Sequence, residues 1–256
     1  METKRCEACG EPLPVQTGRG RRLHYCPKGC KWRAFRQRQK VFRCDQPQRN
    51  KPSLDLIYCA GDNKRLTQIA AQAGFKIGIR SGRSSHGYPV SFVDIEYKRP
   101  NFEKHLKAVK EHGPKYATVL DLSDRDVSEQ DIERALRQYQ QLADYCEIPL
   151  IVPKLPKQLA LFPAHIAVGW SIRTSYGGVS EDMKPWHFEG RRVHILGGSP
   201  QEQIDLYKRL SPFATVMSVD GNMAQLLATQ WAKYWENGVW VDHPQPTNCA
   251  TRLLKR

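Results

Sequence analysis

The sequence contains no apolar run of about 18 residues or more, and its first residues lack the pattern of a secretory signal peptide. The first absence excludes a membrane-spanning helix of ordinary length, and the second argues against export. Internal repeats and low-complexity tracts are absent as well. We therefore expect a soluble, intracellular protein with no membrane partner.

Acidic residues are scarce at the start of the chain. Residues 1–52 contain 14 Lys and Arg but only 4 Asp and Glu, so this segment carries +10 of the total formal charge of +14. Such a concentrated positive field attracts a polyanion. Nucleic acid is the partner we expect, and an anionic membrane fits less well because no long amphipathic basic helix accompanies the charge. The length of 256 residues suits one large domain and a small appendage.

Eight cysteines are present, and four of them form two closely spaced pairs near the N-terminus. The spacing within each pair is that of zinc ligands, and two such pairs can complete a tetrahedral site. The predicted ligands of one structural zinc ion are Cys6, Cys9, Cys26 and Cys30. A closed site of four thiolates is structural rather than catalytic, and it stabilises a segment too small to build a core. The other cysteines, expected to be free thiols, are Cys44, Cys59, Cys146 and Cys249.

A basic segment with aromatic residues, KWRAFRQRQK, follows the last of these zinc ligands. It is typical of a helix that packs Trp32 and Phe35 on a zinc finger. The predicted nucleic-acid contacts are Arg33, Arg36, Arg38 and Lys40. A solvated charged face is the alternative. The pattern resembles small treble-clef-like bacterial and phage fingers, so we expect a zinc finger with a basic helix at 1–42 and a polar, proline-containing linker at 43–53.

From residue 54 onward, short apolar runs alternate with longer amphipathic segments. The runs predict strands at 54–60, 76–80, 90–97, 116–122, 148–154, 165–172, 193–196 and 216–219. The amphipathic segments predict helices at 63–73, 101–111 and 128–146, and one more between the last two strands. This alternation favours an α/β fold, a compact and irregular TIM-type (β/α)8 barrel over residues 54–256 in which at least one connection lacks its helix. A doubly wound open sheet is the alternative.

The clearest unit of this domain is the segment 193–222, in which an apolar strand, a Gly197-Gly198 turn and a helix lead to a second apolar strand. The expected apolar side of the helix consists of Ile204, Leu206, Tyr207 and Leu210. The second strand ends at Asp220, which Gly221 follows. A carboxylate at the end of a strand in a parallel α/β fold is a candidate for chemistry, and a turn residue or the N-cap of the next helix is the other interpretation.

Three further residues fall at or just beyond the ends of predicted strands, namely Asp94, Asp121 and Lys154. In a barrel they would converge with Asp220 on one mouth, where different surroundings can give each carboxylate a different protonation behaviour. We therefore expect a pocket lined by three carboxylates and one lysine.

The segment 165–178 adds glycines beside aromatic residues, a combination that suits a flat, close-packed ligand such as a nucleobase. The glycines are Gly169, Gly177 and Gly178, and the aromatic residues are Trp170 and Tyr176. We expect Gly169 to contribute to substrate binding, while Gly177 and Gly178 fit a plain loop equally well.

In order and character, the segments 116–122, 148–154, 165–172 and 193–222 resemble the tRNA-guanine transglycosylase superfamily. They look most like its shortened phage relatives, DpdA-type enzymes that insert 7-deazaguanine bases into DNA. The resemblance covers about residues 54–240, and LGGSPQEQ followed by VMSVDGN is its most specific part. These strings are similar to the family's glycine-rich turn before the last helix and to its nucleophile-bearing last strand. The chain departs from the family at Asp94, which precedes Ile-Glu instead of the family's Ser-Gly-Gly-Phe-Gln, and it lacks the C-terminal zinc ligands.

The resemblance implies that Asp220 is a nucleophile and Asp94 a general acid and base, while Asp121 recognises the guanine edge and Gly197 and Gly198 line the pocket. A carboxylate that attacks C1′ of deoxyguanosine would displace guanine and form a covalent glycosyl-enzyme, as in a retaining glycosidase. The target base must leave the stack to be reached. The implied partners are DNA and a free 7-deazaguanine base, the only implied metal is structural zinc, and the location is the cytoplasm, of the host if the chain is viral.

Two other functions remain open from the residues alone. The first is a non-catalytic nucleic-acid-binding protein in which the barrel is a scaffold for the zinc finger. The second, a metal-dependent hydrolase, is disfavoured because the barrel segment has no HxH or HExxH cluster. The patterns leave open the oligomeric state and which deazaguanine is used.

Overall fold

The computed structural model describes residues 54–60, 63–122, 128–173, 177–223, 227, 233–236 and 239–242. The predicted zinc finger, its basic helix and the linker at 43–53 lie outside this part of the chain. The residues concerned are Cys6, Cys9, Cys26, Cys30, Arg33, Arg36, Arg38 and Lys40. Their predicted roles stay predictions.

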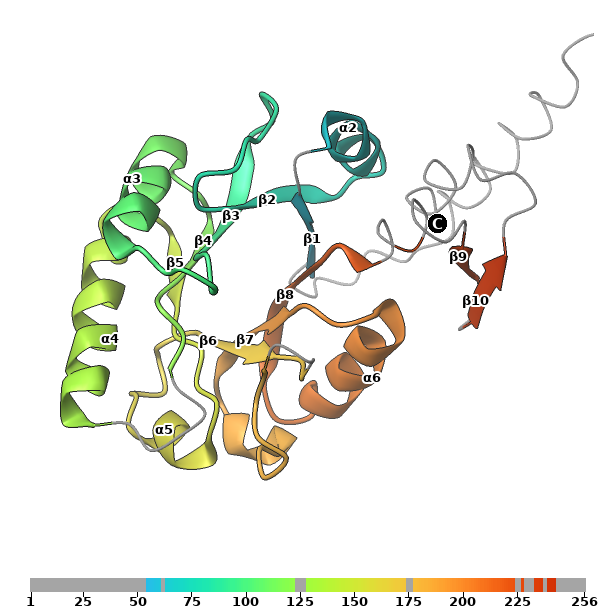
Figure 1. The fold of residues 1–256 in the computed structure, drawn as a ribbon. Coiled ribbons are helices and arrows are strands. Elements are labelled where there is room, and N and C mark those ends of the chain that lie inside the picture. Colours follow the sequence, from blue (N-terminus) through green and yellow to red (C-terminus); the bar gives the residue numbers. More distant parts are fainter. Residues whose placement is uncertain are drawn as a thin grey trace, which may run out of the picture. The chain divides into compact units, whose positions relative to one another are not determined.

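Eight parallel strands form one sheet that curves into a barrel. The strands are β1 (Asp55–Ala60), β2 (Lys76–Arg80), β3 (Val90–Asp94), β4 (Tyr116–Thr118), β5 (Ile148–Leu150), β6 (Val168–Ser171), β7 (Arg192–Leu196) and β8 (Thr215–Gly221). Their order is β5-β4-β3-β2-β1-β8-β7-β6, and an isolated parallel bridge between Ile151 and Val168 joins the two edge strands. The fold is therefore a nearly closed TIM-type barrel, and the doubly wound sheet is excluded. Figure 1 looks roughly along it, with β1 to β8 following one another around the centre.

The helices lie outside the ring of strands (Figure 1). They are α2 (Lys64–Gln72), α3 (Phe102–His112), α4 (Glu129–Ala143), α5 (Pro156–Ala160) and α6 (Pro200–Leu210), with a 3-10 turn, η1, at Pro185–Phe188. Between β2 and β3, residues 81–89 contain no helix, as predicted for an irregular barrel. The starts of the helices follow from the sequence, because side chains of Asn63, Asn101, Ser128 and Ser199 accept hydrogen bonds from backbone N–H groups of the first turns.

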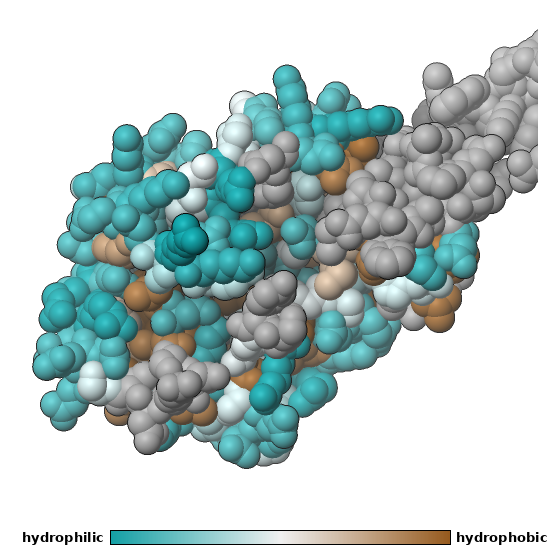
Figure 2. Space-filling model, in the orientation of Figure 1, coloured by the Kyte–Doolittle hydropathy of each residue, from teal (hydrophilic) through white to brown (hydrophobic). Residues whose placement is uncertain are grey.

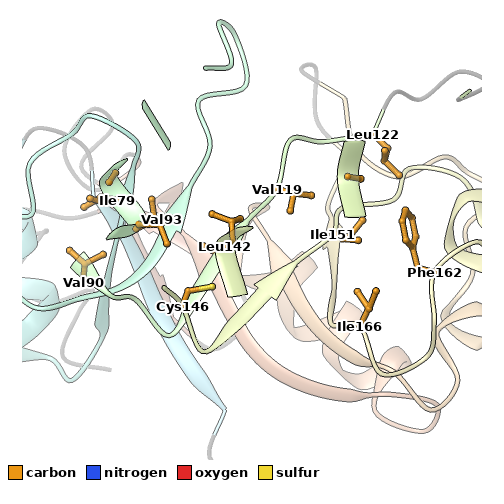
Figure 3. Close-up of a cluster of buried hydrophobic side chains, with 14 residues drawn as sticks. Ile79, Val90, Val93, Val119, Leu122, Leu142, Cys146, Ile151, Phe162 and Ile166 are labelled. Carbon is orange, nitrogen blue, oxygen red and sulfur yellow. The ribbon is translucent and has the colours of Figure 1, made fainter. Parts of the chain in front are cut away.

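One apolar core lies between the outer face of the sheet and helices α3 and α4. Figure 3 shows side chains of this cluster, among them Val93, Val119 and Ile151 from the strand segments and Leu142 from α4. All four are completely buried. Burial of one such side chain contributes about 1.5–3 kcal/mol, so this layer holds the helices against the barrel.

The inside of the barrel is a second, smaller core rather than a channel. Its buried members are Ile57, Phe92, Tyr116, Ile148, Leu150 and Ala167. Gly78 makes room for this packing, because a Cβ atom there would lie 2.9 Å from Cγ2 of Ile57 and 3.1 Å from Cδ1 of Phe92. Large side chains thus fill the middle of the barrel, and polar groups collect at its two ends.

A buried carboxylate occupies the end of the barrel where the strands begin. Oδ2 of Asp55 accepts hydrogen bonds from Lys76 at 2.8 Å, Lys115 at 3.1 Å and the Tyr116 hydroxyl at 2.9 Å. Burial raises the pKa of Asp55, but these three donors outweigh it and hold the pKa below its usual value. Because this end lies opposite the strand ends that carry chemistry in such barrels, the network stabilises the fold.

The apolar side of α6 is narrower than predicted. Leu206 and Leu210, one turn apart, are buried, but Ile204 and Tyr207 are 42% and 37% exposed. The prediction for Ile204 and Tyr207 is wrong, because the helix faces the barrel along the line through Leu206 and Leu210, and Tyr207 and Ile204 lie about 80° and about 140° away from it.

A short antiparallel hairpin, β9 (Lys233–Glu236) and β10 (Val239–Asp242), follows the barrel strands and was not expected. Its sequence signal is the Asn-Gly pair at 237–238 between two short segments rich in aromatic residues and valine, KYWE and VWVD. Lys233 and Asp242 form an ion pair at 3.0 Å across it.

Hydrophilic residues cover most of the described surface on the face shown in Figure 2, with hydrophobic residues in small patches between them. None of the described helices has the length and apolar character needed to cross a membrane.

Candidate active site

The predicted site residues of the barrel lie at the ends of four strands. Asp94 is the last residue of β3 and Asp220 lies near the end of β8, while Asp121 and Lys154 follow β4 and β5. The negative charges of Asp220 and Asp121 both raise the pKa of Asp94, as expected for carboxylates at the same ends of parallel strands. The structure therefore brings the three carboxylates together at the mouth where the strands end.

Among the described carboxyl groups, Asp94 is the one whose pKa is raised strongly by its surroundings. Its Oδ1 accepts a hydrogen bond of 2.9 Å from the hydroxyl of Thr118, which is completely buried. Burial, followed by the negative charges of Asp220 and Asp121, raises the pKa of Asp94 from 3.8 to about 7, against smaller opposing effects of Thr118 and Arg80. A carboxyl group with this pKa can both give and take a proton near neutral pH.

Asp220 is 6% exposed and its side chain points into the barrel. Its Oδ1 lies 3.1 Å from Nε2 of His194 and 3.4 Å from the backbone nitrogen of Gly197. The thiol of Cys59 also forms a hydrogen bond with this carboxylate. These contacts are not those of a turn residue or a helix cap, so the alternative interpretation of Asp220 is wrong.

Lys154 and Asp121 form an ion pair with a distance of 2.6 Å between Nζ and Oδ2. The lysine side chain is 8% exposed and the aspartate side chain 38%. The backbone around Lys154 is fixed, because its N–H donates to Oε1 of Gln158 at 2.7 Å and its carbonyl oxygen accepts from the N–H of Ser180 at 2.7 Å. The pair thus presents a cation and an accessible carboxylate side by side.

The Gly197-Gly198 turn follows β7 with φ angles of +70° and +81°, in the left-handed region that favours glycine. A Cβ atom on Gly197 would meet nothing within 4 Å, so this residue has open space beside it. A Cβ atom on Gly198 would lie 2.5 Å from Cδ1 of Ile172, and one on Gly169 would lie 2.5 Å from Cδ1 of Leu196. Packing against neighbouring side chains of the protein therefore accounts for both Gly198 and Gly169.

The profile of a family described only as a family of unknown function, DUF6610, matches residues 70–256, well over half of the chain. The chain belongs to the DUF6610 family. The matched range contains β2 to β8 and with them Asp94, Asp121, Lys154 and Asp220.

No curated protein sequence matches this member of the DUF6610 family. Among solved structures, it matches that of N-(5'-phosphoribosyl)anthranilate isomerase from Pyrococcus furiosus, with 12% sequence identity and a TM-score of 0.31, over 79% of this chain and 99% of that chain. The assignment of the barrel rests on the strand pairing itself.

Several site residues of this DUF6610 member were not expected from the sequence. They are Cys59, Arg80, Thr118, His194, Gln203 and Ser218. The available signal was the period of two along a strand, which puts Ser218 on the same face as Asp220. A polar residue between two apolar ones, as His194 between Val193 and Ile195, is the other such signal.

Gln203 connects helix α6 to the ends of two strands. Its side-chain Nε2 donates to the carbonyl oxygens of Gly197 and Asp220, each at 2.8 Å. A Cβ atom on Gly221 would lie 2.9 Å from the same nitrogen. The glycine after Asp220 therefore makes room for Gln203.

Trp170 does not contribute to the mouth. Its ring is 6% exposed and packs on Phe188, with ring centroids 4.9 Å apart, in a separate apolar cluster that also contains Leu206 and Leu210 of α6. The prediction that Trp170 helps to form a flat pocket is wrong, because alternate residues of a strand face opposite sides and Gly169 takes the inward position. Tyr176 lies outside the described residues.

The loop after β6 fits the interpretation of Gly177 and Gly178 as residues of a plain loop. Gly178 has a φ of +143°, and a Cβ atom there would lie 2.4 Å from Cα of Arg173, so two stretches of backbone approach closely. A Cβ atom on Gly177 would meet nothing within 4 Å.

Within the described part of the chain, no three His, Cys, Asp or Glu side chains are arranged to hold a metal ion. The predicted zinc ligands lie outside that part. Cys59 and Cys146 are free thiols, as predicted.

Proposed function

We propose that the barrel is a transglycosylase that exchanges guanine in DNA for a 7-deazaguanine base through a covalent bond to Asp220. The observation that carries the proposal is the proximity of Asp220 to Asp94, whose pKa is raised to about 7. A double displacement at a sugar carbon requires two neighbouring carboxyl groups, one that attacks the carbon and one that transfers the proton.

In the first half of the reaction, a carboxylate oxygen of Asp220 forms a bond to C1′ of the deoxyribose while the bond from C1′ to N9 of guanine breaks. The electron pair of that bond leaves with guanine, which takes a proton from the carboxyl group of Asp94. In the second half, N9 of the incoming base attacks C1′ and the electron pair of the ester bond returns to Asp220. The proton of N9 passes to the Asp94 carboxylate, so both groups return to their starting state.

The ion pair of Lys154 and Asp121 suits recognition of the base. The hydrogen-bonding edge of guanine offers an acceptor at O6 beside donors at N1 and N2, and a 7-deazaguanine has the same edge. An ammonium group donates only and a carboxylate accepts only, so Lys154 would meet O6 and the more exposed Asp121 would meet N1 and N2. The same pair would therefore hold both the leaving and the incoming base.

DNA as the substrate is supported by charge. The predicted basic segment carries +10 within residues 1–52. At the mouth, the guanidinium group of Arg80 lies 5.7 Å and the ammonium group of Lys98 6.0 Å from the ring centre of Tyr97, which is 44% exposed. Cations at the rim can contact phosphates on either side of a nucleotide that has left the stack.

The test is mass spectrometry of nucleosides from the DNA of cells that express the full chain and are supplied with free 7-deazaguanine bases. We expect a deazaguanine nucleoside with the intact protein and none with Asp220→Asn. Asp205→Asn, which changes an exposed carboxylate on α6, is the matched control and should behave as the intact protein. DNA binding by the intact protein without base exchange under any of these conditions would favour the alternative, a non-catalytic nucleic-acid-binding protein.

A further inference from the structure

Three polar side chains, linked by hydrogen bonds, form a network that extends from the mouth of the barrel into its interior. Nε2 of His194 lies 3.1 Å from Oδ1 of Asp220, and Nδ1 of the same ring lies 2.6 Å from Oγ of Ser218. His194 and Ser218 have no exposed surface, whereas Asp220 is 6% exposed. Asp220 is therefore the member of this network at the mouth, and Ser218 is the member deepest in the interior.

The direction of each hydrogen bond follows from the groups involved. A carboxylate accepts, so Nε2 of His194 carries the hydrogen that points to Asp220. Nδ1 is then the acceptor and takes the hydrogen of the Ser218 hydroxyl. If the ring carried hydrogens on both nitrogens, the hydroxyl of Ser218 would itself need another acceptor, and its side chain contacts none among the described residues. Ser218 thus fixes which nitrogen of His194 carries the hydrogen.

The order of the three groups differs from that of a serine hydrolase. There the serine faces the substrate and the carboxylate lies behind the histidine. Here Ser218 has no exposed surface and the carboxylate faces the mouth. The histidine and the serine can act on a substrate only through Asp220.

Two aromatic rings from the neighbouring strands β3 and β4 pack near the imidazole ring of His194. Its centre lies 4.8 Å from that of the Phe92 ring and 6.0 Å from that of the Tyr116 ring. Tyr116 is itself fixed, because its hydroxyl donates to Asp55 at the opposite end of the barrel. The ring of His194 therefore has little freedom to turn away from Asp220.

We propose that His194 and Ser218 are positioning residues that anchor Oδ1 of Asp220 and so direct its other oxygen, Oδ2, at the substrate. The N–H of Gly197 supports the same oxygen, since it lies 3.4 Å from Oδ1. The inference rests on the proposed nucleophilic role of Asp220, but the hydrogen-bonded chain itself is testable without any reaction.

The first test is nitrogen NMR of the full chain labelled at histidine, with the His194 signals identified by their loss in His194→Gln. We expect the hydrogen on Nε2 in the intact protein, and a mixture of both neutral forms in Ser218→Ala. Ser81→Ala is the matched control, because Ser81 lies 2.5 Å from Nδ1 of another buried histidine, His105, and should leave the His194 signals unchanged. A hydrogen on Nδ1 of His194 in the intact protein would overturn the proposed hydrogen-bond network. Unchanged His194 signals in Ser218→Ala would overturn it as well.

The second test is kinetic and uses base exchange by the full-length protein. We expect His194→Phe to lower kcat about 100-fold with KM for DNA within twofold, because the carboxylate keeps its charge but loses its fixed orientation. His194→Gln, whose amide can donate from nearly the same place as Nε2, should recover a good part of that loss. A kcat within twofold of the intact protein for His194→Phe would overturn the positioning role, as would equal losses for Phe and Gln. Absence of exchange by the intact protein would instead refute the proposed function, and the NMR result would stand separately.

Discussion

At the scale of single residues, the neighbouring carboxyl groups of Asp94 and Asp220 differ in their hydrogen-bond donors and in the charges near them. Asp94 has the hydroxyl of Thr118 as its side-chain donor and faces the charges of Asp220 and Asp121. Asp220 receives the hydrogen of His194, the N–H of Gly197 and the thiol of Cys59. The environment of Asp94 therefore favours its protonated form up to near-neutral pH, whereas the donors around Asp220 fix the orientation of its carboxylate.

The electrostatic link between these groups predicts that Asp220→Asn lowers the pKa of Asp94. The charge of Asp220 is the largest cause of the raised pKa after burial, so its removal should bring the pKa clearly below about 7. Asp121→Asn should lower it by less. Carbon NMR of the aspartate carboxyl groups against pH measures both, with Asp205→Asn as the control that leaves Asp94 unchanged. A pKa that stays near 7 in Asp220→Asn would show that the two groups do not share a site.

The raised pKa of Asp94 also predicts an unusual dependence of stability on pH. Because the folded protein holds the Asp94 proton more tightly than the unfolded chain, ionisation of this group costs stability as the pH rises from 3.8 to about 7. Asp94→Asn cannot ionise, and its amide oxygen can still accept from Thr118. The variant should therefore be more stable than the intact protein by about 2–4 kcal/mol at pH 8 and nearly equal at pH 4. Urea unfolding at both values measures the difference, and a variant that is less stable at pH 8 would contradict the pKa.

At the scale of strands and helices, much of the site was predictable, because the direction of each strand decides at which end of the barrel the residue after it lies. In a parallel barrel all strands end at one mouth, so an aspartate after an apolar run, such as Asp94 or Asp121, must lie there. The hydrogen-bond partners were not predictable, because they depend on register. Val193 pairs with Val216 but His194 pairs with Ser218, so β8 contains an extra residue, Met217.

That bulge places His194 opposite Ser218 and Leu196 opposite Asp220. No glycine or proline in the segment TVMSVD marks it. The side of α6 that faces the barrel was likewise only partly predictable, since apolar residues such as Ile204 also occur on its exposed side. Register and helix rotation are settled by packing between elements, which a local pattern does not contain.

The connection between α6 and the strand ends gives a prediction at this scale. Gln203→Ala removes the donor to the carbonyl oxygens of Gly197 and Asp220 and should loosen the turn beside the mouth. We expect hydrogen exchange at the Gly197 amide to rise about 10-fold, which corresponds to about 1.4 kcal/mol of local opening free energy. The control is Gln201→Ala on the same helix, whose side chain donates to the exposed Asp205 at 2.7 Å and to no other residue in the described part of the chain. Equal exchange at Gly197 in both variants would contradict the role of Gln203.

At the scale of the whole molecule, charge is unevenly distributed between the N-terminal segment and the barrel. Residues 1–52 carry +10 and the remaining residues only +4. The basic helix predicted after the zinc ligands should therefore supply much of the affinity for DNA, while the mouth of the barrel selects the base.

The uneven charge predicts how DNA binding depends on salt. Replacement of Arg33, Arg36, Arg38 and Lys40 by Gln should weaken binding to all sequences alike. Each lost phosphate contact should lower the slope of log affinity against log salt by about 0.9. Binding measured between low and physiological salt tests this, with Lys107→Gln on the exposed side of α3 as the control. An unchanged slope would show that the basic segment does not contact phosphates.

The nucleophilic role of Asp220 is tested most directly by the release of labelled guanine from DNA by the full-length protein in the presence of a free 7-deazaguanine. The intact protein should release guanine and, when denatured during the reaction, should carry DNA covalently bound. Asp220→Asn should remain folded and bind DNA, but release no guanine and trap no DNA, because an amide does not replace a carboxylate as the attacking group. Guanine release by Asp220→Asn at a rate near that of the intact protein would show that Asp220 is not the nucleophile.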